Sequence, residues 1–244
     1  MPAIEVAHVS KAFRIPHEQR TFLREFFVHP FRHVAYERND ALKDVTLSIE
    51  QGEFFGVIGR NGSGKSTLLR ILAGIYVPGS GSVRVHGLLS PFIELGVGFN
   101  LELNARDNIR INATLAGLTK RELKERFDEI LAFSELERFV DQKLKNYSSG
   151  MLVRLAYSIA IQIPFDVLLL DEVLAVGDEA FQEKCFATFD RFKAEGKTVV
   201  FVSHALELVE RFCDRCLLLS NAAMQIIGSP REVIDKYHER VVVS

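Results

Sequence analysis

The chain of 244 residues is 48% hydrophobic and 25% charged, and its 30 Lys and Arg nearly balance 32 Asp and Glu. This composition predicts a globular protein with a large core and excludes disordered, collagen-like and coiled-coil chains. A formal net charge of -2 provides no long-range field that would attract a polyanion, so we expect no nucleic-acid partner.

Neither a leader nor a membrane segment is predicted. The first residues lack the basic and apolar regions of a signal peptide, and no apolar run approaches the length of a membrane span. Cys185, Cys213 and Cys216 are too few for a disulfide scaffold, which favours a reducing cytoplasm. Because the C-x-x-C at 213–216 has no second pair, we interpret it as packed thiols rather than a metal or redox site.

Strand-like and helix-like segments alternate from residue 45 onward. Strands are expected at 45–50, 53–59, 82–86, 167–170, 198–202 and 216–219, and helices at 65–73, 180–193, 206–212 and 231–240. Residues 104–163 are mostly helical in pattern. Because alternating strands and helices produce a parallel sheet covered on both faces, we expect a single α/β domain over 1–244, interrupted by a helical subdomain at about 98–160.

One stretch matches the phosphate-binding pattern G-x-x-x-x-G-K-[ST] in full, between an expected strand and an expected helix. Its glycines let backbone N–H groups converge on phosphates, and the following helix presents its positive end. The lysine reaches the terminal phosphates, and the serine hydroxyl can bind Mg²⁺. The candidate residues are Gly59, Arg60, Asn61, Gly62, Ser63, Gly64, Lys65, Ser66 and the Thr67 that follows.

Two acids and a histidine are expected at the same sheet edge as this loop. Asp171 ends an apolar strand and would hold Mg²⁺, whereas the adjacent Glu172 would polarise an attacking water as general base. His204 follows the strand at 198–202 and would contact the γ-phosphate or that water. Because ligands bind at the carboxyl ends of parallel strands, this position favours a role in the nucleotide site for all three residues.

Taken in order along the chain, these motifs resemble those of the nucleotide-binding subunit of an ABC transporter. Tyr147-Ser148-Ser149-Gly150-Met151 stands where this family has its Leu-Ser-Gly-Gly-Gln signature, and Asp178 stands in the D-loop. The resemblance implies a P-loop core, an antiparallel β-subdomain and the inserted helical subdomain. It also implies that ATP and Mg²⁺ bind between two copies, with Ser148, Ser149 and Gly150 acting across a homodimer and Phe13 stacking on adenine.

Three variant motifs together resemble the ATP-binding subunits of polysaccharide exporters. They are the altered signature with Arg154 downstream, the run from Asp171 to Asp178 and the run from Glu94 to Phe99. This resemblance implies a separate membrane permease, a lipid-linked O-antigen, teichoic acid or related glycan as cargo, and a place on the cytoplasmic face of the inner membrane. The alternatives are the ATPase of an importer or of a drug or lipid exporter, and a soluble ABC ATPase.

Several features depart from the usual pattern of that family. No Gln stands between Arg60 and Lys120, where most members have one, and Glu94 is a candidate for its place. The stretch 14–40 interleaves aromatic residues with Arg, which predicts either a helix on its own sheet or a contact with a permease or lipid headgroups. Since the chain ends at Ser244, soon after its last expected helix, we expect none of the carboxy-terminal sugar-binding domains that some exporters carry.

Overall fold

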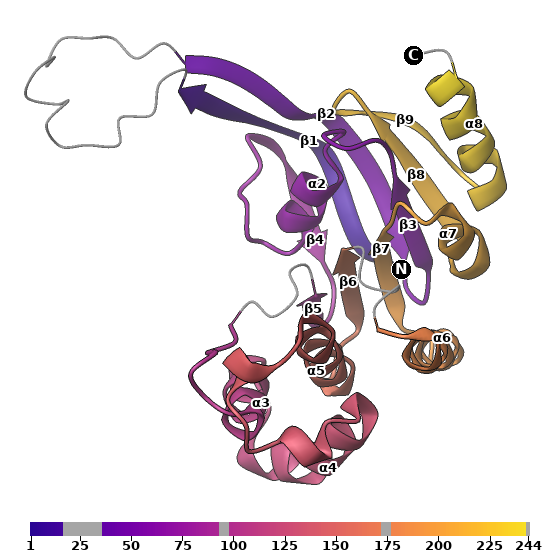
Figure 1. The fold of residues 1–244 in the computed structure, drawn as a ribbon. Coiled ribbons are helices and arrows are strands. Elements are labelled where there is room, and N and C mark those ends of the chain that lie inside the picture. The colour runs from indigo at the N-terminus through magenta and orange to yellow at the C-terminus, as the bar shows by residue number, and fades with distance from the viewer. Residues whose placement is uncertain (17–35, 93–97, 172–176, 243–244) are drawn as a thin grey trace, which may run out of the picture.

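The computed structural model describes residues 1–16, 36–92, 98–171 and 177–242 (Figure 1). Its strands are β1 (Pro2–Pro16), β2 (Tyr36–Glu50), β3 (Phe54–Ile58), β4 (Ser80–Val85), β5 (Leu89–Phe92), β6 (Val167–Asp171), β7 (Thr198–Val202), β8 (Arg215–Ser220) and β9 (Ala223–Gly228). Its helices are α2 (Lys65–Leu72), α3 (Ala105–Leu115), α4 (Lys120–Ser134), α5 (Ser149–Gln162), α6 (Glu179–Ala194), α7 (Leu206–Phe212) and α8 (Pro230–Val242), with short 3-10 turns at Glu137–Phe139 and Leu144–Asn146.

Within these ranges the strands form one mixed sheet in the order β4-β1-β2-β9-β8-β3-β7-β6-β5. The half from β8 to β5 is parallel, whereas β1 pairs antiparallel with both β2 and β4. This parallel core with an antiparallel edge, together with the helices, confirms the predicted α/β fold class.

The central parallel strands β3, β6 and β7 are buried along almost their whole length because helices cover both faces of the sheet. Phe54 and Ile58 of β3 belong to one apolar cluster with α6 and α7, whereas Phe55 and Val57 belong to a second cluster with α2. This alternation follows the period of two in a strand. All five β3 residues are therefore buried, which explains why the strand appears in the sequence as an uninterrupted apolar run.

Helices α3, α4 and α5 lie together at one end of the molecule, away from the β1–β2 hairpin (Figure 1). They share an apolar cluster that includes Ile109, Ile130 and Leu155. Helix α4 starts in a capping box, since Thr119 accepts from the Glu122 N–H and the Glu122 carboxylate accepts from the Thr119 N–H. The helices that were expected between 104 and 163 are thus present. The subdomain boundary at 98–160 remains a prediction.

The strands β1, β5 and β9 were not expected from the sequence. In β1 the register shifts between Val6 and Val9 and again between Val9 and Lys11, and His8 adopts a positive φ of 52°. These irregularities break the alternation on which a strand prediction depends. The two ends of the stretch 14–40 are also strands, at 14–16 and 36–40, whereas its centre lies outside the described residues.

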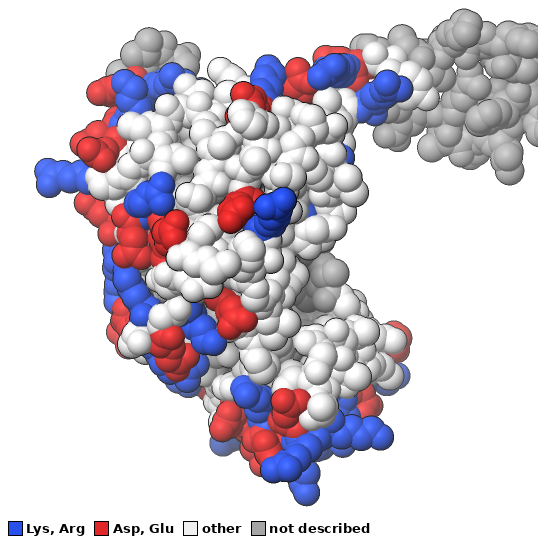
Figure 2. All heavy atoms as spheres, turned by 180° about the vertical axis from the view of Figure 1, so that it is seen from behind, with Lys and Arg blue, Asp and Glu red and all other residues white. Residues whose placement is uncertain are grey.

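Within the described ranges, none of the helices combines the length and the apolar character that spanning a membrane requires. Seen from behind, Lys and Arg side chains mix with Asp and Glu along one side and at the helical end, and few of either occupy the middle of this face (Figure 2). The two signs of charge are thus interspersed on this face, as the near-zero net charge suggests.

Candidate nucleotide site

The phosphate loop connects β3 to α2, and its conformation requires glycine at two positions. Gly59 has a φ of 152° and Gly64 a φ of 110°. A Cβ at Gly59 would lie 2.2 Å from the carbonyl oxygen of Leu219, and one at Gly64 would lie 2.4 Å from that of Ala41. Both contacts are with backbone and cannot be relieved by a side-chain rotation. The sequence motif therefore matches a backbone path that other residues would not follow.

Lys65 lies across the loop that it follows. It is only 5% exposed, and its Nζ donates to the carbonyl oxygens of Gly59 at 2.8 Å and Arg60 at 3.1 Å. Among the described residues no side chain caps the start of α2, where Gly64 is the N-cap, so its first N–H groups face outward from the helix end. These features fit a phosphate group, which takes both N–H donors and a cation.

Ser63 gives an independent sign of an anion site. Its Oγ is buried and has no hydrogen-bond partner within the described chain. A buried hydroxyl without a partner is costly unless a ligand or water satisfies it. Among the other loop residues, Arg60, Asn61, Gly62 and Ser66 are exposed, so a ligand can reach the loop from solvent.

Strand register brings the carboxylate candidate to the level of the phosphate loop. Asp171 of β6 pairs with Val202 of β7, and Val202 pairs with Val57 of β3, two residues before the loop begins. Because neighbouring strands lie about 4.8 Å apart, Asp171 is roughly 10 Å across the sheet from Val57. The carboxylate of Asp171 and the hydroxyl of Ser66 are hard oxygen donors of the kind that Mg²⁺ takes, so this donor set fits the ion.

His204 follows the end of β7 by two residues and is exposed at the same edge of the sheet. The buried Ser203 beside it accepts a hydrogen bond from the Ala205 N–H at 3.0 Å, which fixes the turn that carries the histidine. Glu172, the general-base candidate, and Glu94, the candidate for the missing Gln, both lie outside the described residues.

The signature residues form the start of α5. Ser148 is the N-cap, and its Oγ accepts from the Met151 N–H at 3.2 Å. Ser148 and Ser149 are exposed and Gly150 is half-buried, so the positive end of this helix is open to solvent. Tyr147 anchors the turn beneath, since its hydroxyl donates to the Phe139 carbonyl at 2.8 Å and burial raises its pKa to about 12.

Asp178 is the N-cap of α6 and accepts from the Phe181 N–H at 3.0 Å. This hydrogen bond, with Arg154 beside the carboxylate, holds the pKa of Asp178 below its ordinary value. Arg154 comes from α5, and its Nη2 lies 2.7 Å from the second oxygen of Asp178. The sequence alone gives Arg154 no role, because no spacing rule predicts which side chain on another helix it reaches.

Phe13 lies on β1, where it pairs with Asn39 of β2. Its ring meets that of Tyr76 edge to face at 5.5 Å, and the Lys11 Nζ lies 5.4 Å from its centre. Phe13 is only half-buried and belongs to none of the apolar clusters of the described chain. Its environment is therefore an aromatic and cationic corner at the surface, and its stacking on adenine stays a prediction.

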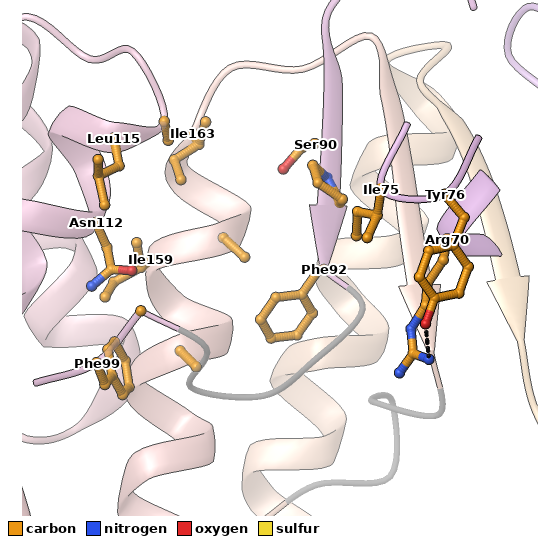
Figure 3. A pocket seen from close by; sticks show the side chains of 15 residues that line it. Arg70, Ile75, Tyr76, Ser90, Phe92, Phe99, Asn112, Leu115, Ile159 and Ile163 are labelled. Atoms are coloured by element: carbon orange, nitrogen blue, oxygen red, sulfur yellow. Dashed lines mark hydrogen bonds between the residues drawn. The ribbon is translucent and has the colours of Figure 1, made fainter. Parts of the chain in front are cut away.

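A large apolar pocket of about 770 Å³ opens between the sheet and the helical end. Phe92 points into it from β5, facing Phe99 and Ile159, whereas Arg70 and Tyr76 form its polar rim through a 3.4 Å hydrogen bond (Figure 3). Leu115 and Ile75, which also line it, are 76% and 57% exposed. Sequence analysis missed this pocket because its walls come from five separate segments.

The cysteines are packed thiols, as the sequence predicts. All three are buried and free, and burial raises the pKa of Cys185 and Cys216 to about 12 and that of Cys213 still higher. In the described ranges no group of three or more His, Cys, Asp and Glu residues could hold a metal ion by itself. The Mg²⁺ expected at Ser66 and Asp171 would therefore need further oxygen ligands.

The sequence profile described as ABC transporter matches residues 42–175. The O-antigen export system ATP-binding protein RfbB of Klebsiella pneumoniae is 41% identical over 98% of both chains. RfbB of Myxococcus xanthus is 42% identical over 99% of this chain and 56% of its own length. The teichoic acids export ATP-binding protein TagH of Levilactobacillus brevis is 40% identical over 97% of this chain and 64% of its own.

Solved structures agree on the fold. A dimeric ATP-binding cassette in a post-hydrolysis state with ADP and Pi superposes with a TM-score of 0.75 at 23% identity, covering 93% of this chain and 99% of its own. The ATP-binding subunit of an ABC transporter superposes with a TM-score of 0.76 at 22% identity, covering 97% and 93%.

Proposed function

Because the chain belongs to the ABC transporter family, we propose that it is the ATP-hydrolysing subunit of an exporter that moves a lipid-linked cell-envelope polysaccharide through a separate permease. Membership confirms the resemblance that the motifs predicted and makes the chain an ABC ATPase. The cargo follows from relatives named for O-antigen and teichoic acid export, over nearly the whole chain. The main structural support for the proposal is the phosphate loop. Lys65 donates to a carbonyl of this loop, and strand register aligns Asp171 with it.

In this proposal the triphosphate of ATP lies on the loop. The N–H groups at the start of α2 and the Lys65 ammonium receive its oxygens, and the buried Ser63 hydroxyl gains the partner that it lacks. Ser66 and Asp171 would hold Mg²⁺, which neutralises phosphate charge when bound. Glu172 would accept a proton from the attacking water, and His204 would contact the γ-phosphate from the neighbouring strand.

The complete site is proposed to need a second copy of the chain. The open helix end at Ser148, Ser149 and Gly150 is a second anion-binding feature, and each subunit would offer it to the ATP held by the other. Asp178 would lie in the same interface. ATP binding would then close the homodimer, and hydrolysis with product release would reopen it.

The apolar pocket is the proposed contact with the permease. Its lining is mostly apolar and includes the exposed Leu115 and Ile75, and an exposed apolar patch of this kind is typical of an interaction site. A helical segment of the permease, with apolar residues on one face, fits a groove of this kind. This arrangement would bring the ATPase to the cytoplasmic side of the inner membrane.

Two other functions have the same chemistry in the nucleotide site. An importer or a drug or lipid exporter would differ only in the permease, and a soluble ABC ATPase would have none. The 41% identity to an O-antigen exporter subunit over 98% of both chains favours glycan export.

A cellular complementation experiment tests this function. In a strain that lacks the gene, the parent chain should restore glycan at the cell surface, whereas Glu172→Gln should leave lipid-linked glycan accumulated inside. Purified Glu172→Gln should also run as a dimer with ATP in size-exclusion chromatography and as a monomer without it. Normal surface glycan in the deletion strain would refute glycan export, and full ATPase activity of Glu172→Gln would remove this residue as the base.

A further inference from the structure

Arg154 connects three helices through its two terminal nitrogens. Nη1 donates to Glu135 Oε2 at 3.0 Å, just beyond the end of α4, and Nη2 lies 2.7 Å from Asp178 Oδ2 at the start of α6. The guanidinium also lies over the Phe181 ring, 4.9 Å from its centre. The Arg154 side chain is only 18% exposed, although its two acidic partners are 45% and 67% exposed.

The conformation and the partners of Glu135 indicate that its contact with Arg154 is a specific feature of the fold. Glu135 is in the left-handed region, with φ 59° and ψ 32°, which costs a non-glycine residue about 1 kcal/mol. In that position its carboxylate receives Arg154 through one oxygen and Lys184 of α6 through the other. These contacts lower the pKa of Glu135, chiefly through the Lys184 hydrogen bond. The acids and cations alternate in a chain from α4 through α5 to α6.

We propose that Arg154 is a positioning residue that holds the Asp178 turn in fixed relation to the Ser148 end of α5. Arg154 lies on the helix that begins at Ser148, and it grips the residue that caps α6. The N-terminal ends of α5 and α6 thereby form one rigid surface. This inference rests on the proposed two-subunit site, in which that surface meets the ATP of the partner subunit.

The geometry explains why arginine is required. Two different nitrogens reach two carboxylates on separate helices while the flat guanidinium covers an aromatic ring. A lysine has one compact ammonium and cannot make these three contacts together. Preorganised donors and acceptors matter most in the closed state, since a shift of about 1 Å can cost on the order of 100-fold in rate.

Three variants separate this role from general stability. Arg154→Ala removes all contacts, and Arg154→Lys retains the charge. Asp178→Ser keeps a hydroxyl that can accept from the Phe181 N–H but is too short to reach Arg154. The matched control is Arg121→Ala, which breaks an exposed pair with Glu125 on α4.

In the chain of 244 residues we expect Arg154→Ala and Asp178→Ser to reduce kcat for ATP hydrolysis at least tenfold. Their affinity for a fluorescent ATP analogue, bound by the monomer through the phosphate loop, should stay within twofold of the parent. Arg154→Lys should recover only part of kcat, and Arg121→Ala should match the parent. The double variant Arg154→Ala/Asp178→Ser should be no slower than the slower single variant, because the two residues act through one contact.

Hydrogen exchange of the ATP-free chain provides a readout that does not depend on the dimer. Amides at 178–182 should exchange faster in Arg154→Ala than in the parent, whereas those of the phosphate loop should not change. Unchanged exchange there together with parental kcat would overturn the proposal. If Arg154→Ala fails to fold, the same measurements on Asp178→Ser and Arg154→Lys test the proposal. Failure of the parent to dimerise with ATP would instead refute the two-subunit site, which distinguishes the two inferences.

Discussion

Lys65 Nζ lies 2.8 Å from the carbonyl oxygen of Gly59, so the cation of the phosphate loop is held by the first residue of that same loop. This hydrogen bond and the one to Arg60 orient a side chain that is 95% shielded from water. The ammonium is thereby held in one position beside the loop. Preorganisation of this kind lowers the entropy that binding would otherwise cost.

Replacement of Lys65 by Ala should weaken ATP binding at least tenfold, equivalent to about 1.4 kcal/mol or more, because a charge-assisted contact with phosphate is lost. Isothermal titration with a nonhydrolysable analogue measures this change. Lys143→Ala is the control, since Lys143 lies on the exposed surface and pairs with Glu102. Equal affinity for parent and Lys65→Ala would remove this lysine from the site.

Gly59→Ala should disrupt the phosphate loop itself. The new methyl group would meet the Leu219 carbonyl at 2.2 Å with φ held at 152°, so we expect a loss of unfolding free energy of roughly 2 kcal/mol or more. Urea denaturation measures this loss, and ATP affinity should fall with it. Gly74→Ala is the matched control, because Gly74 has a positive φ of 73° with open space around its Cβ position. A similar cost for both variants would show that backbone strain alone, and not the contact, matters.

The sequence predicted the strands and the phosphate loop at this edge of the sheet better than their surroundings. The loop at 59–66 and the strands that end at Asp171 and Val202 are encoded by local pattern, since glycines and buried apolar runs follow directly from backbone and burial requirements. By contrast, Arg154 meets Asp178 and Glu135 only through packing of three helices, and the pocket at Phe92 and Leu115 arises where distant segments meet. Long-range relationships of this kind have no local signature in one sequence.

The aromatic corner at Phe13 allows a direct test of adenine stacking. We expect Phe13→Ala to weaken binding of a fluorescent ATP analogue by about three- to tenfold, since a ring stack contributes about 0.5–1.5 kcal/mol. Tyr36→Ala should change nothing, because Tyr36 pairs with Pro16, three residues farther along β1, and is 61% exposed. Titration with the fluorescent ATP analogue measures the affinity of both variants. If instead Phe13→Ala binds normally and Tyr36→Ala does not, the adenine lies farther out along the hairpin.

Tyr157 offers a test of the core beneath the signature helix. Its ring is buried between Phe92, Phe133 and Phe181, and its hydroxyl has no hydrogen-bond partner among the described nitrogen and oxygen atoms, although the Cys185 thiol is near. Tyr157→Phe removes a buried polar group and keeps the ring, so the free energy of unfolding should be unchanged or rise by up to about 1 kcal/mol. Tyr157→Ala should lower it by about 3–5 kcal/mol through the cavity it leaves. Chemical denaturation measures the free energy of unfolding of both variants. A loss above about 1 kcal/mol for Tyr157→Phe would mean that the hydroxyl has a stabilising partner. The Cys185 thiol would be the first candidate, and Cys185→Ala would test it.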